Sequence, residues 1–194
     1  MKVRIGLLVV AVCFCLVGCT KEEKEVKTRA EEVGTTIESG DMEDINNLIF
    51  GINESDVVSG MEEVLGTGES DTTQEGILSD IFKRNTIKVD NVSKDTIEYQ
   101  IEAPDLSEIF VEILNEKKDL SEEQLLEYMR EYIGKAELKK VTVTIPYTVE
   151  NEKIIIDYQN EEFIDAITGG LLSAYRQLYQ DMINEYMKEM GISE

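Results

Sequence analysis

The segment from residue 138 to residue 149 is the feature that most limits what this chain can fold into. Apolar side chains stand at every second position of its latter part, namely Val141, Val143, Ile145, Tyr147 and Val149. This alternation predicts a β-strand with one buried and one solvated face, as in an antiparallel sheet. Pro146 lies within the run and has no backbone N–H, so we expect that position at a sheet edge or a bulge.

Three shorter runs predict the rest of the sheet. Residues 86–92 and 96–103 alternate in the same way, and the short Ser93–Asp95 segment between them predicts a hairpin. Residues 153–158 follow the first run after a short turn, which predicts a second hairpin. The consecutive isoleucines at 154–156 indicate burial on both faces. We therefore expect one antiparallel sheet of about four strands.

Helical periodicity marks the remaining segments. Apolar side chains recur every three or four residues at 26–37, 42–52, 77–82, 106–114, 125–133, 163–167 and 171–190. We expect Pro104–Asp105 to start the helix between the hairpins, and Gly169–Gly170 to separate the last two helices. The apolar line of 171–190 is interpreted as core, the commoner role of such a line. The sequence thus predicts an α+β fold with N-terminal helices, inserted helices and a long C-terminal helix.

The N-terminus has the sequence pattern of an export signal. Lys2 and Arg4 precede an apolar run at 5–17, which is too short for a comfortable membrane span, and small Gly18 precedes Cys19. The segment Leu16-Val17-Gly18-Cys19 resembles a bacterial lipobox. That resemblance implies a diacylglyceryl group on the Cys19 thiol and signal cleavage between Gly18 and Cys19. The alternatives are an ordinary cleaved signal peptide or a lone membrane anchor, and the polar residues directly after Cys19 argue against both.

These features divide the chain into three parts. We expect residues 1–18 to form a lipoprotein signal peptide, residues 19–27 the lipidated cysteine with a charged tether, and residues 28–194 a single α+β domain. We expect the protein on the outer face of the cell membrane, held there by the lipid on Cys19. The membrane is therefore its first predicted partner.

Charge excludes one class of partner. The chain has 19 Lys and Arg against 41 Asp and Glu, a formal net charge of −22. Loss of Lys2 and Arg4 with the signal leaves 17 basic side chains against the same 41 acidic ones, or −24. Phosphate binding depends on clustered Lys and Arg, so nucleic acid is not expected as a partner.

Composition also limits the chemistry. The chain has no His and no Trp, and its three Cys are Cys13, Cys15 and Cys19, all in the signal or at its end. Ser-His-Asp and Cys-His catalysis and the usual zinc sites are thereby excluded, and we expect no cofactor, no metal and no catalytic residue. Carboxylate clusters at 122–131 and 161–165 are interpreted as solvated helix faces. A carboxylate-based hydrolase and a weak calcium site near 90–98 are left as minor alternatives.

The order of elements resembles a known group. Early helices, the hairpins at 86–103 and 138–158 and the run from Asn160 to Leu172 follow the lipobox and tether. This layout resembles small lipoproteins of Gram-positive bacteria whose exported part is similar to the nuclear transport factor 2-like, cystatin-like cone. The resemblance implies helices wrapped by a curved antiparallel sheet, and it supplies no catalytic residue to transfer.

A cone of this kind places any ligand on the concave face of its sheet. The side chains expected there are Tyr99, Ile101, Val143, Ile145 and Tyr147. Tyrosine hydroxyls beside apolar side chains can supply the polar contacts of a pocket for a small apolar ligand. The alternative is that all of these side chains pack as core, which the dense interiors of small domains favour.

Two functional classes remain. The first is a non-enzymatic binding or interaction module with an unidentified ligand. The second is a structural accessory subunit of an envelope machine that docks through the C-terminal helix. An open apolar cavity would favour the first class, whereas an exposed Tyr/Met stripe on 171–190 beside a closed pocket would favour the second.

Overall fold

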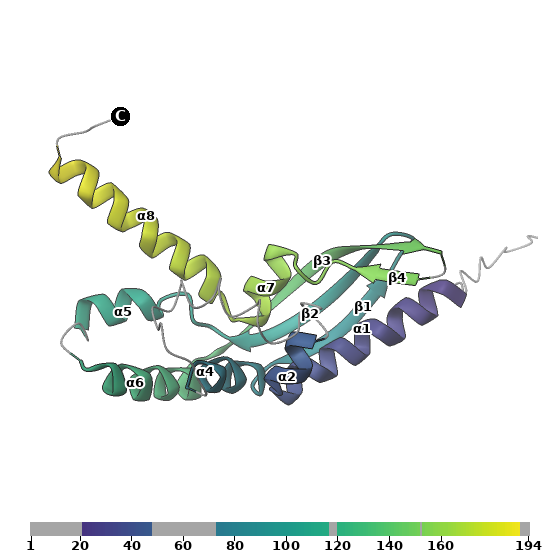
Figure 1. The fold of residues 1–194 in the computed structure, drawn as a ribbon, viewed down its shortest axis with the longest axis horizontal. Coiled ribbons are helices and arrows are strands. Elements are labelled where there is room, and N and C mark those ends of the chain that lie inside the picture. Colours follow the sequence, from purple (N-terminus) through teal and green to yellow (C-terminus); the bar gives the residue numbers. More distant parts are fainter. Residues whose placement is uncertain (1–20, 48–72, 117–119, 152, 191–194) are drawn as a thin grey trace, which may run out of the picture.

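The computed structural model describes residues 21–47, 73–116, 120–151 and 153–190. The predicted signal peptide, Cys19 and the second half of the helix expected at 42–52 lie outside these ranges. Within them, the predicted α+β architecture is confirmed: helices flank a curved antiparallel sheet (Figure 1).

The sheet follows the chain in order. Its strands are β1 (Thr86–Val92), β2 (Thr96–Pro104), β3 (Leu138–Glu150) and β4 (Lys153–Ile156), each antiparallel to the next. Both predicted hairpins are therefore confirmed. The prediction that 154–156 is buried on both faces was wrong, because Ile155 is 45% exposed. Ile155 pairs with Thr148 on the solvated face of the sheet, so alternation and not continuous burial governs this short strand.

Seven helices are described. Before the sheet come α1 (Lys21–Ser39), α2 (Met42–Ile45) and α4 (Thr73–Phe82); between the hairpins come α5 (Ile109–Glu116) and α6 (Glu122–Lys135); after the sheet come α7 (Glu161–Ile167) and α8 (Leu171–Glu189). Polar side chains fix several helix starts, because Asp41, Ser121 and Asn160 each accept hydrogen bonds from backbone N–H groups of the following turn.

Two helix starts differ from the sequence prediction. The charged segment assigned to a tether is helical from Lys21 onward, and Val26 within it is fully buried. The helix expected after Pro104–Asp105 begins only at Ile109. The Asp105 carboxylate accepts hydrogen bonds from the N–H and hydroxyl of Ser107, at 3.1 and 2.7 Å, which holds this segment as a turn.

The core lies against one face of the sheet. Helix α1 runs along β1, and α7 packs on β2 and β3, both on the face that carries Tyr99 and Ile101. The opposite face carries polar side chains that are exposed or half-buried, among them Lys88, Glu98, Gln100, Thr142 and Thr144. The sheet therefore has one face packed against helices and one face exposed to solvent, as the alternation in β3 predicts.

Helix α8 leaves the body of the molecule. Its first turn packs near α5 and α7, and the rest projects outward, so that its free end and the start of α1 lie at opposite ends of the molecule (Figure 1). In the described part of the chain, no helix combines the length and the apolar character needed to cross a membrane.

Candidate functional site

The residues predicted to line a pocket all lie on the packed face of the sheet. Tyr99 pairs with Val143 across β2 and β3, and Tyr99 is fully buried. Its ring lies 5.2 Å from that of Phe163 on α7, and its hydroxyl is 3.4 Å from the carbonyl oxygen of Ala30 and 3.5 Å from the Tyr158 hydroxyl. The side chain expected to face a ligand is therefore packed between α1 and α7.

The buried tyrosines are held in their neutral form. Burial raises the pKa of Tyr158 to about 12, and burial together with the neighbouring Tyr158 raises the pKa of Tyr99 further. The hydroxyl of Tyr147 donates to the carbonyl oxygen of Ser93 at 2.7 Å, which ties β3 to the β1–β2 turn. Ile101 and Ile145 are fully buried. Of the predicted pocket residues, Tyr99, Ile101, Ile145 and Tyr147 therefore support the fold, as the core alternative predicts.

A cavity of about 280 Å³ lies next to this core, between the edge of β3 and α7. Its apolar walls include Val141, Val143 and Ala166, and Glu162 and Asp165 contribute polar groups. Val143 is the member of the predicted set that reaches it. Lys139, which also borders the cavity, is 3.6 Å from the Asp105 carboxylate.

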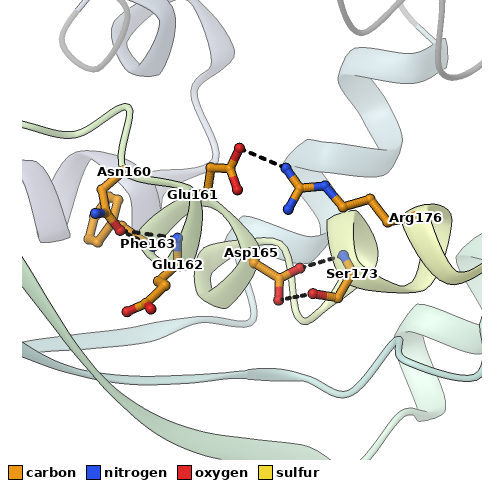
Figure 2. A network of polar contacts seen from close by, with 7 residues as sticks. All are labelled: Asn160, Glu161, Glu162, Phe163, Asp165, Ser173 and Arg176. Atoms are coloured by element: carbon orange, nitrogen blue, oxygen red, sulfur yellow. Dashed lines mark hydrogen bonds and ion pairs between the residues drawn. The ribbon is translucent and has the colours of Figure 1, made fainter.

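Asp165, Gly169 and Gly170, at the junction of α7 and α8, border this cavity. The junction carries a small polar network (Figure 2). The Asp165 carboxylate accepts hydrogen bonds from the N–H and the hydroxyl of Ser173, both at 2.8 Å. Arg176 on α8 lies 2.8 Å from Glu161 on α7. This pair lowers the pKa of Glu161 and raises the pKa of Arg176. The network holds the first turns of α8 against α7.

Beyond this junction α8 presents an uncovered apolar face. We name its members the α8 stripe: Tyr179, Met182, Ile183, Tyr186 and Met190, which are 43–64% exposed. Their spacing places them on one side of the helix. The interpretation of this line as core holds for its start, where Leu171 is buried and Leu172, Tyr175 and Leu178 are half-buried, but it was wrong from Tyr179 onward. The projection of α8 away from the body explains the difference (Figure 1).

The stripe continues an interhelical contact. Phe110 on α5 and Tyr175 on α8 have ring centroids 6.2 Å apart. One turn farther along each helix, on the same side, Leu114 is 49% and Tyr179 is 57% exposed. The two helices diverge after their contact, which leaves apolar side chains of both uncovered (Figure 1).

The carboxylate clusters are placed as solvated groups. Glu122, Glu123 and Glu127 are exposed on α6, and Glu161 pairs with Arg176. Among the described residues, no three His, Cys, Asp or Glu side chains gather as a metal site requires. No family model, curated protein or solved structure matches this chain.

Proposed function

We propose that this chain is a lipid-anchored accessory protein on the outer face of the cell membrane, and that it docks on a partner protein through α8. The observation that carries this proposal is the α8 stripe. Five large apolar side chains on one side of a projecting helix are characteristic of an interaction surface, and Tyr and Met are enriched in protein interfaces.

The shape of the surface favours a helical partner. The stripe runs from Tyr179 to Met190, a distance of 11 residue rises or about 16 Å at 1.5 Å per residue. Leu114 of α5 borders its inner end, where the two helices diverge. A third helix laid along α8 would bury the stripe and Leu114 together, as in helix-in-groove recognition.

Charge favours a basic partner over a second copy. The chain carries −22, so self-association would bring two strongly acidic domains together, whereas flanking Lys or Arg side chains on a partner helix would be attracted. We therefore commit to a partner protein with an amphipathic, basic-flanked helix.

The lipid surface is a poorer occupant. An anchor at Cys19 would hold the molecule by the end where α1 begins, and α8 projects from the other end (Figure 1). Helices that lie on membranes carry many Lys and Arg on the polar side, but Arg176 is paired with Glu161 and the remaining basic residue of α8 is Lys188.

The size of the native complex tests the proposal. Three proteins are extracted in mild detergent, and the sizes of the complexes that contain them are measured. They are the wild type, a stripe variant with Met182→Ser and Tyr186→Ser, and a matched variant with Asp181→Ser and Asn184→Ser on the opposite side of α8. We expect the wild type and the matched variant in a complex with another protein, and the stripe variant alone. A wild type that runs alone or as a homodimer, or a stripe variant that stays in the complex, would contradict the proposal. All four positions are exposed, so each substitution should change the free energy of unfolding by less than about 0.5 kcal/mol.

A further inference from the structure

Strand β3 has an edge that is only partly covered. Residues 138–146 pair with β2 on one side. On the other side β4 covers only Tyr147–Glu150, because it is four residues long. On the side away from β2, the stretch of β3 before Pro146 therefore has no neighbouring strand in the described part of the chain.

The hydrogen bonds around Pro146 show which backbone groups point to that side. The Tyr147 N–H donates to the carbonyl oxygen of Asp95 at 2.9 Å, which places the odd-numbered residues of β3 toward β2. The Pro146 carbonyl accepts from the Asp157 N–H at 3.1 Å, on the side of β4. Successive residues of a strand direct their N–H and C=O groups to opposite sides, so the even-numbered residues point away from β2.

The opposite edge of the sheet confirms this alternation. The Ile87 N–H in β1 also points away from β2, and it is bonded to the Glu38 carboxylate on α1. That edge is therefore covered by a helix. On β3, by contrast, the N–H and C=O groups of Lys140, Thr142 and Thr144 have no hydrogen-bond partner among the described residues. An open row of this kind is a template for one more strand.

The 280 Å³ cavity lies along the same edge. Thr142 borders it together with Val141, Val143 and Ala166. The side chains of an added strand would point alternately to the two faces of the sheet, so every second one would enter this cavity. Its volume and apolar walls suit small apolar side chains, and exposed Glu162 at its border suits a basic neighbour.

We propose that the β3 edge from Lys140 to Thr144 binds an extended segment of a partner protein as an added β-strand. The segment alternates small apolar side chains with polar ones and carries net positive charge. Pro146 has no N–H and its carbonyl is occupied, so the added strand is short and ends there. Positive charge complements a chain of −22, which a second copy would not. This surface is separate from the α8 stripe and goes beyond the function proposed above.

Amide hydrogen exchange of the mature, lipidated protein in detergent tests, without any ligand, whether the β3 edge is free. We expect fast exchange at Lys140, Thr142 and Thr144, and slow exchange at Val141 and Val143, which bond to β2. Protection of all five amides would mean that the edge is already covered, and would overturn the proposal.

A displayed library of random octapeptides tests the occupant. We expect enriched peptides that alternate small apolar with polar residues, carry positive charge and slow exchange at Lys140, Thr142 and Thr144. Their binding should weaken about tenfold or more in Thr142→Pro, which removes one outward N–H and no bond to β2. Thr142→Val keeps that N–H and should bind as the wild type does.

Other outcomes of the selection overturn the proposal. These are the absence of any enriched peptide, equal binding to Thr142→Pro, or protection at other amides. If Thr142→Pro fails to fold, the exchange measurement on the wild type decides. The Met182→Ser/Tyr186→Ser variant should bind the selected peptides normally, so a failure of α8 docking and a failure of this proposal are distinguishable.

Discussion

The carboxylate of Asp165 accepts two hydrogen bonds from Ser173, one from its backbone N–H and one from its hydroxyl, both at 2.8 Å (Figure 2). Ser173 is in the first turn of α8, whose own N-cap residue is Gly170 and has no side chain to contribute. Asp165 on α7 therefore does for α8 what a capping side chain does within one helix. This contact joins the first turn of α8, the helix that carries the α8 stripe, to α7.

Replacement of Asp165 tests that role. Asp165→Ala leaves the Ser173 N–H without its acceptor, so the free energy of unfolding should fall by about 0.5–2 kcal/mol, the usual cost of a lost cap. Glu162→Ala removes an exposed carboxylate from the same helix and should change the free energy of unfolding by less than about 0.5 kcal/mol. Urea denaturation followed by circular dichroism measures both. Equal effects of the two variants would show that Asp165 does not act as a cap.

Gly169 should be far more sensitive than Gly134 to the same change. Gly169 has φ +68°, and a Cβ built there would lie 2.0 Å from the carbonyl oxygen of Pro104. Gly169→Ala should therefore cost more than the roughly 1–2 kcal/mol of left-handed strain alone. Gly134 is within α6, and among the described residues no atom outside the neighbouring backbone of that helix lies within 4 Å of such a Cβ. Gly134→Ala should therefore stabilise the fold by up to about 1 kcal/mol. Thermal unfolding of the two variants side by side checks the difference, and comparable melting temperatures would refute it.

The buried tyrosines predict loss of stability in alkali. The pKa of Tyr158 is about 12 in the folded state against 10.0 for a free tyrosine. Between these values the unfolded chain ionises while the folded one stays neutral, so stability is retained below pH 10 and falls as the pH rises toward 12. Each such tyrosine contributes up to about 1.4 kcal/mol per pH unit.

Tyr158→Phe should make the decline of unfolding free energy above pH 10 less steep. Tyr179→Phe is the matched control, because Tyr179 is 57% exposed in the folded state, and it should leave the slope unchanged. Urea titrations at a series of alkaline pH values give the slopes. Identical slopes for the two variants would rule out burial of Tyr158 as the cause.

Lipid attachment at Cys19 is tested directly in the native host. Mass spectrometry should find an N-terminus at Cys19 that carries a diacylglyceryl group. Cys19→Ala should leave unlipidated protein as the precursor or in the medium. A wild-type protein that keeps Met1 would show that the lipobox resemblance is misleading.

Short-range patterns carry most of what could be predicted about the fold. Alternation located β1, β2 and β3, and apolar side chains at helical spacing located the helices around them. Ile155 was misjudged because a run of isoleucines does not reveal whether a strand is covered on one face or two. The start of α5 was misjudged because the Asp105 side chain bonds to Ser107 and holds a turn where Pro104 suggested a helix.

The candidate surfaces were harder to find from the sequence. Alternation placed Tyr99 on the correct face of the sheet, but only the packing of Phe163 and Ala30 around it shows that it belongs to the core. Helical spacing identified the apolar line of α8, yet it is the same for a buried and an exposed stripe. Pro146 did indicate an edge, whereas the outward direction of the Thr142 backbone follows from the register of the strands.

Photo-crosslinking in intact cells of the native host tests the central claim most directly. Benzoylphenylalanine replaces Tyr186 in the α8 stripe or Asp181 on the opposite side of the helix. We predict one discrete adduct with another protein from position 186, joined to a helical segment with flanking Lys or Arg, and none from position 181. No protein adduct at 186, an adduct with lipid or with a second copy, or equal adducts at both positions would contradict docking through α8.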